Sequence, residues 1–241
     1  MSVFRFQQFS VLQARSGMKV CTDATLFGAM APVAGGEKVL DIGTGTGLLA
    51  LMAAQLGAGN TTAVELNRAT FEEARINFGN SPWAEDIHAV HADIRDYAAH
   101  TNERFDLIIS NPPFFERHSK SPDDLRNLAR HTDELPYAEL LHCAEQLLAA
   151  NGKLYLLLPV MAVQQVQKEA EELELFLYRK INLKGYERNT AKVAALLFSR
   201  IATGFQETTL TIYRSDRVYS KDAEGFLSPF LLRFAPRTRT A

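Results

Sequence analysis

The chain has 241 residues, of which 46% are hydrophobic and 22% charged, with a formal net charge of −2 at pH 7. This composition is that of a globular domain with a full core, and its near-neutral charge gives no global signal for nucleic-acid binding, although a local basic face would be enough. No apolar run reaches about 18 residues and no secretory signal is present, so we expect no membrane span. The two cysteines form neither a disulfide framework nor a metal-ligand pattern, which favours a cytoplasmic protein without a metal.

From Glu37 onward, short apolar runs alternate with helical patterns, which is typical of a parallel sheet with crossover helices. We expect one α/β domain over residues 1–241, of Rossmann-like architecture, with a seven-stranded, mostly parallel sheet and helices on both faces. An N-terminal segment (1–36) precedes the core (37–200), and 201–241 should form a hairpin and a helix. The predicted strands are 38–42, 61–65, 87–91, 105–110, 153–158, 175–184 and 192–200, and the predicted hairpin strands are 208–213 and 217–220.

A glycine-rich turn, Asp41-Ile-Gly43-Thr44-Gly45-Thr-Gly47, follows the first predicted strand and opens a helix. Glycines there allow a sharp turn and the close approach of a ligand. Their spacing differs from the G-x-G-x-x-G of dinucleotide-binding folds, and an aspartate suits a cationic ligand better than a pyrophosphate. S-adenosylmethionine carries a sulfonium and an ammonium, so we predict that Asp41, Gly43, Thr44, Gly45 and Gly47 bind this cofactor.

Two further carboxylates follow the next two strands. Glu65 ends the second strand, where it can accept both hydroxyls of a ribose. Asp93, with Ile94 next to it, follows the third strand and can accept a hydrogen bond from the adenine amine of the cofactor. A single carboxylate at a strand end is commonly a turn former or a helix cap. Three in succession at the carboxyl edge, where open α/β sheets bind ligands, favour a cofactor site.

The fourth strand ends in Asn111-Pro112-Pro113-Phe114. Two prolines alone would indicate only a stiff strand exit. Together, however, the Asn111 side-chain oxygen and the Pro112 carbonyl can accept the two hydrogens of a planar exocyclic amine, while Phe114 stacks on its ring. The lone pair then points at an activated methyl group, and catalysis is mostly positioning. We predict that these four residues are catalytic and that Asn111 also contacts the cofactor.

These motifs resemble those of amino-group methyltransferases, and most closely the bacterial valine-tRNA adenine-N6 methyltransferases. Residues 17–28, 80–85, 105–115 and 128–132 carry the resemblance, which spans essentially the whole chain. It implies S-adenosylmethionine as the cofactor and the adenosine 3′ of the anticodon in valine tRNA as the target. It also implies that the segment before the first strand covers the methionine end of the cofactor, through Lys19, Thr22 and Asp23. Cys21 stands where that family is expected to have a glycine, and Pro229 interrupts the expected final helix.

The same residues also allow other hypotheses about the function. Methylation of a protein glutamine or of another nucleic-acid amino group uses the same chemistry. A nicotinamide-dependent oxidoreductase is a further alternative, but the Asn111–Phe114 motif would then have no role. A cofactor-binding protein without activity is another, and the intact motif disfavours it. Basic residues favour a nucleic-acid partner: Arg179, Lys180, Lys184, Arg188, Lys192, Arg200, Arg233, Arg237 and Arg239. The resemblance implies that this partner is tRNA, bound through its anticodon stem-loop, and we expect the enzyme to be a monomer. The 115–136 loop, rich in charge, is a further candidate RNA contact.

Overall fold

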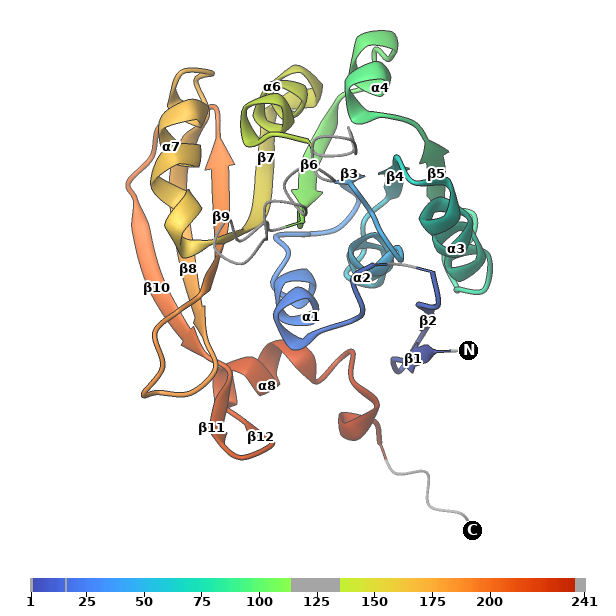
Figure 1. Ribbon diagram of the computed structural model, residues 1–241, viewed down its shortest axis with the longest axis vertical. Coiled ribbons are helices and arrows are strands. Elements are labelled where there is room, and N and C mark those ends of the chain that lie inside the picture. Colours follow the sequence, from blue (N-terminus) through green and yellow to red (C-terminus); the bar gives the residue numbers. More distant parts are fainter. Residues whose placement is uncertain (1, 16, 114–134, 237–241) are drawn as a thin grey trace, which may run out of the picture.

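The structure, a computed structural model, describes residues 2–15, 17–113 and 135–236. Its centre is one sheet, and the bounds of its strands are β3 (Lys38–Ile42), β4 (Asn60–Glu65), β5 (Ile87–His91), β6 (Phe105–Ser110), β7 (Leu148–Pro159), β8 (Phe176–Lys184), β9 (Val193–Ser199) and β10 (Gln206–Thr211). They form an eight-stranded sheet in the order β10-β8-β9-β7-β6-β3-β4-β5 (Figure 1). All neighbours pair in parallel except β9, which is antiparallel to both β7 and β8.

Helices cover both faces of this sheet (Figure 1). One face packs against α1 (Thr22–Ala29), α2 (Leu48–Gln55), α3 (Arg68–Gly79) and α8 (Lys221–Leu227). The other packs against α4 (Ile94–His100), α6 (Tyr137–Leu147) and α7 (Val163–Glu171). Successive residues of a strand point to opposite faces, so Val39 enters the first core and Leu40 the second. The predicted fold class, a mostly parallel sheet between two helical layers, is confirmed.

The predicted strand number of seven is wrong, because residues 206–211 form an eighth strand. The sequence predicts a hairpin strand at 208–213, but β10 instead pairs in parallel with β8 along the edge of the main sheet. Only Leu210 in β10 is buried, so the segment shows no clear alternation in its sequence. Pairing satisfies backbone groups that β8 would otherwise present at an open edge. The actual hairpin is shorter and joins β11 (Tyr213–Ser215) to β12 (Val218–Tyr219).

The segment before the main sheet contains two short strands, β1 (Val3–Arg5) and β2 (Ser10–Leu12), and is held by buried polar side chains of α3. Asn77 accepts a hydrogen bond from the Leu12 amide at 2.8 Å and donates to the Leu12 carbonyl at 2.9 Å. Glu73 accepts from the Ala14 amide at 2.6 Å. Buried polar groups need such partners, so these contacts fix the course of the chain just before residues 17–20.

The two extensions of the core pack against each other. The Gln7 side chain donates to the carbonyl oxygens of Ser228 and Leu231 at 2.6 and 2.9 Å, and a β-bridge joins Phe6 to Leu231. Helix α8 ends at Leu227, so the proline that we expected to interrupt the last helix lies beyond its end. Within the described ranges, no helix has the length and apolar character needed to cross a membrane.

Candidate active site

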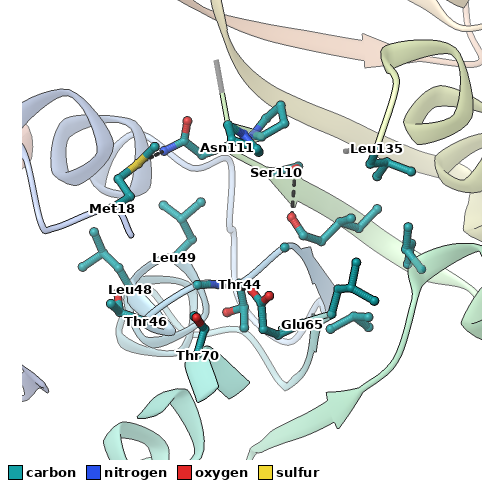
Figure 2. A pocket seen from close by; sticks show the side chains of 18 of the residues that line it. Met18, Thr44, Thr46, Leu48, Leu49, Glu65, Thr70, Ser110, Asn111 and Leu135 are labelled. Carbon is teal, nitrogen blue, oxygen red and sulfur yellow. Dashed lines mark hydrogen bonds between the residues drawn. The ribbon is translucent and has the colours of Figure 1, made fainter. Parts of the chain in front are cut away.

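A pocket of about 290 Å³ lies at the carboxyl edge of the sheet (Figure 2). Each of four parallel strands ends at its wall: the glycine turn follows β3, Glu65 ends β4, Asp93 follows β5 and Asn111 follows β6. Residues 17–20, from the N-terminal segment, line it as well. Figure 2 shows Asn111 and Glu65 on opposite sides of this pocket. The parallel order of the strands therefore brings most of the predicted site residues together.

The glycine turn forms part of the wall, and its glycines have different roles. Gly43 and Gly45 line the pocket and have φ angles of 70° and 58°, a region that other residues rarely adopt. Gly47 lies outside the lining. It is the N-cap of α2, with φ 84°, and a Cβ atom there would lie 2.3 Å from the ring of Phe78. The pocket lining therefore gives no support for the predicted contact between Gly47 and the cofactor. The close packing of α2 against Phe78 of α3 explains why this position is a glycine.

Asp41 lies beneath the turn and does not line the pocket. Its side chain is fully buried, and one oxygen accepts hydrogen bonds from the Thr44 hydroxyl at 2.6 Å and the Ala50 amide at 3.2 Å. The other oxygen has no hydrogen-bond partner among the described residues. Burial raises the pKa of this carboxyl from 3.8 to about 7, against the lowering effect of its hydrogen bonds. Asp41 therefore braces the turn that a ligand would touch.

We expect the thermal stability of the ligand-free protein to contain a component from Asp41 that falls as pH rises. A carboxyl with a raised folded-state pKa binds its proton more tightly when folded, so its contribution is present below the unfolded pKa and is lost between about pH 4 and 7. Melting temperatures at about pH 5.5 and 8 should differ less in Asp41→Asn than in the wild type. The same pH profile in both proteins would contradict the assignment of this titration to Asp41.

Glu65 joins two loops of the pocket. One carboxylate oxygen accepts from the Gly45 amide at 2.9 Å, and the other accepts from the Asn67 amide at 2.8 Å. The side chain is half-buried and lines the pocket, so its remaining lone pairs face the space where a ligand would lie. Glu65 can thus order the glycine turn and accept ligand hydroxyls at the same time.

Asp93 and Ile94 begin α4 and line the pocket. The Asp93 carboxylate accepts from the Arg95 amide at 2.8 Å and forms an ion pair with the Arg95 guanidinium. That guanidinium also binds Glu139 at 2.8 Å. The hydrogen bond from the Arg95 side chain is the main reason why the pKa of Asp93 is lowered, so the group is a permanent acceptor at neutral pH. Arg95 also lines the pocket, a role that the sequence analysis missed.

Asn111 presents an unused acceptor. Its side-chain nitrogen lies 3.7 Å from the sulfur of Met18, while its side-chain oxygen is buried and has no hydrogen-bond partner in the described part of the chain. The strand end beneath it is fixed, because the Ser110 hydroxyl donates to the Ile42 carbonyl at 2.8 Å. Pro112 and Pro113 follow in the same wall, whereas Phe114 lies outside the described residues. An orphan buried acceptor of this kind is expected where a ligand donates.

Of the N-terminal residues, the structure brings only some to the pocket. Lys19 lines it, but Thr22 does not, and its hydroxyl lies 3.1 Å from that of Tyr213 instead. Asp23 is half-buried and is also absent from the lining. Further lining residues were not singled out from the sequence: Met18, Val20, Leu48, Leu49 and Thr70. Leu48 and Leu49 had a sequence signal in the apolar start of the helix after the glycine turn, and Met18 and Val20 lie in the segment that carries the family resemblance. No group of three or more potential metal ligands occurs within the described ranges.

Comparison with known proteins agrees with this geometry. The Methyltransferase small domain family matches residues 19–174. The tRNA1(Val) (adenine(37)-N6)-methyltransferase of Trichodesmium erythraeum is 40% identical over 234 residues, which cover 96% of this chain and 98% of the relative. The enzyme of the same name from Tolumonas auensis is 39% identical, again over 96% and 98% of the two chains.

Solved structures support the fold. A predicted O-methyltransferase from Agrobacterium tumefaciens superimposes with a TM-score of 0.67 over 84% of this chain and 94% of its own, at 15% identity. Taken with the family match, the glycine turn and the strand-end pocket identify S-adenosylmethionine as the cofactor and methyl transfer as the activity. The chain belongs to the Methyltransferase small domain family and, by its similarity over nearly its whole length, to the family of tRNA1(Val) (adenine(37)-N6)-methyltransferases.

Proposed function

We propose that this enzyme methylates the N6 amine of an adenosine in tRNA, namely the one 3′ of the anticodon in valine tRNA. The names of its relatives support this substrate. The observation that carries the proposal is the buried, unpartnered side-chain oxygen of Asn111 at the wall of the pocket. An acceptor in that position suits the hydrogen of an exocyclic amine.

The proposed cofactor residues fit S-adenosylmethionine chemically. Gly43 and Gly45 leave the backbone open to a ligand, because an added Cβ at Gly43 would meet nothing within 4 Å among the described residues. Glu65 suits the ribose hydroxyls, and Asp93 with Ile94 suits the adenine, one as acceptor and the other as apolar surface. Lys19 also lines the pocket, and its ammonium group suits the carboxylate of the methionine end. When bound, S-adenosylmethionine supplies a methyl group activated by its sulfonium.

The chain's own part in the reaction is to hold the amine. The Asn111 oxygen accepts one hydrogen and the Pro112 carbonyl accepts the other, which keeps the nitrogen lone pair out of conjugation and aimed at the methyl group. The two prolines make this wall stiff, so the acceptors are pre-positioned. We also propose that Phe114 stacks on the target ring. A general base with a tuned pKa is unnecessary, since the nitrogen loses its proton after it becomes cationic.

We further propose that residues 1–241 act as a single domain and as a monomer in the cytoplasm. The glycine turn, Glu65, Asp93 and Asn111 all lie at or directly after the ends of strands of one sheet, which supports a single domain.

The test is methyl incorporation into unmodified valine tRNA and into a copy whose adenosine 3′ of the anticodon is replaced by guanosine. We expect incorporation into the first and loss in the second. Equal incorporation into both would contradict the target, and incorporation only into a glutamine-containing protein would contradict the substrate class. Mass spectrometry of the digested nucleosides identifies the product as N6-methyladenosine.

A further inference from the structure

A second cavity, of about 310 Å³, lies between the N-terminal and C-terminal extensions. Phe4 and Arg5 of β1, Tyr219 of β12 and Arg233 line it, over an apolar base that includes Leu227. These residues lie outside 37–200, the part of the chain that contains the glycine turn. The catalytic pocket does not use this space, yet Val20 lines both cavities. The two cavities therefore lie side by side.

The cavity has the charge of a site for an anion. Arg5 and Arg233 are exposed, and no carboxylate lines the cavity within the described ranges, although the whole chain has a net charge of −2. Neither arginine forms a salt bridge with a described residue. By contrast, Lys180 and Lys184, which we first considered as phosphate contacts, are ion-paired with Glu207 and Glu187, each at 2.9 Å. Arg233 donates to the Arg217 carbonyl at 3.2 Å, but its charge, like that of Arg5, is not paired with a carboxylate of the described residues. Guanidinium groups without a carboxylate partner are better placed to bind phosphate.

Two aromatic residues, Phe4 and Tyr219, line the same cavity, and Tyr219 contacts further rings. The rings of Tyr213 and Tyr219 stack with centroids 5.1 Å apart and an interplanar angle of 18°, and Phe234 lies 6.1 Å from Tyr219. The Arg233 guanidinium lies 5.0 Å from the centroid of the Tyr219 ring. Unpaired RNA bases bind to aromatic side chains and to arginine planes, and side chains of both kinds meet at this opening.

We infer that this cavity binds a nucleotide of the substrate tRNA that neighbours the target adenosine, with its base in contact with Phe4 and Tyr219, the aromatic residues of the lining, and its phosphate at Arg5 and Arg233. The inference rests on the proposed function, because it takes the anionic ligand to be the same RNA. It gives both extensions of the core a role in holding RNA beside the catalytic pocket. A small apolar ligand would not explain two arginines without carboxylate partners at the opening.

The first test removes the charge without touching the catalytic pocket. The double variant Arg5→Gln, Arg233→Gln should raise KM for valine tRNA by about tenfold or more. The slope of log affinity against log salt concentration should become shallower by about one to two, since about one or two phosphate contacts are lost. Its affinity for S-adenosylmethionine and its kcat at saturating tRNA should stay close to those of the wild type. The matched control is Arg104→Gln, Lys168→Gln, which removes two exposed charges that line neither cavity. Equal KM values in the two double variants would overturn the inference.

A second test does not depend on folding of a variant. In wild-type protein, a 4-thiouridine placed next to the target adenosine should cross-link on irradiation to residues 4–5 or 219–233. Cross-links confined to other peptides would overturn the inference. Failure of the wild type to methylate any tRNA would instead overturn the proposed function, while the cross-link would still report whether RNA occupies the cavity.

Discussion

Replacing Asn111 by alanine is expected to lower methyl transfer to tRNA by about a hundredfold or more, with the affinity for S-adenosylmethionine within a few-fold of wild type. Removing one pre-positioned hydrogen-bonding group from a reaction centre typically has an effect of about 10²–10³ on kcat. The Asn111 oxygen is buried, lines the pocket and has no partner among the described residues, so its loss removes no internal hydrogen bond of that oxygen. The effect should therefore appear in turnover and leave folding unchanged.

Single-turnover rates with valine tRNA and calorimetric titration with S-adenosylmethionine separate the two quantities. Asn102→Ala, at an exposed position outside the pocket, is the matched control. If Asn111→Ala turns over at the wild-type rate, the reacting centre must lie elsewhere.

Glu65→Ala should weaken S-adenosylmethionine binding by at least about tenfold. A hydrogen bond to a charged group contributes about 1.5–3 kcal/mol, and every 1.4 kcal/mol is about a tenfold change in affinity. The substitution also frees the Gly45 and Asn67 amides, which Glu65 holds in the structure, so part of the loss should come from a less ordered glycine turn.

Glu65→Gln separates these two contributions, because an amide keeps one acceptor oxygen but presents a donor to the second backbone N–H. We expect an affinity between those of the wild type and Glu65→Ala, measured by calorimetry. Glu172→Ala, an exposed carboxylate outside the pocket, serves as the control. An unchanged dissociation constant in Glu65→Ala would move the ribose site away from this side chain.

The sheet was predictable where strands are buried on both faces. Residues 38–42 and 105–110 are short, mostly apolar segments and form β3 and β6 as expected. The eighth strand was not predictable in this way, since four of the six residues of β10 are exposed. Its pairing with β8 depends on how the chain packs in three dimensions, which the local sequence does not encode. The helix α1 was also missed, because six of its residues are buried and it therefore lacks an amphipathic pattern.

The candidate site was predictable in outline for a related reason. Parallel strands end at the same edge, so polar residues after β3, β4, β5 and β6 had to meet there. Which side chains reach the pocket was not readable from spacing. Asp41 points into the protein and binds Thr44, and Gly47 is required by its contact with Phe78. Such distinctions depend on packing behind the turn, which motif spacing does not encode.

The contacts between Gln7 and the carbonyl oxygens of Ser228 and Leu231 join positions 221 and 224 residues apart. During synthesis on a ribosome, Gln7 emerges long before these partners exist. The cavity that contains Arg5 and Arg233 is thus completed last, after the sheet can already have formed. A chain cut short before residue 228 would keep the glycine turn and Asn111 but lack this cavity. An unfinished enzyme would therefore have its reaction centre without the proposed RNA-binding cavity.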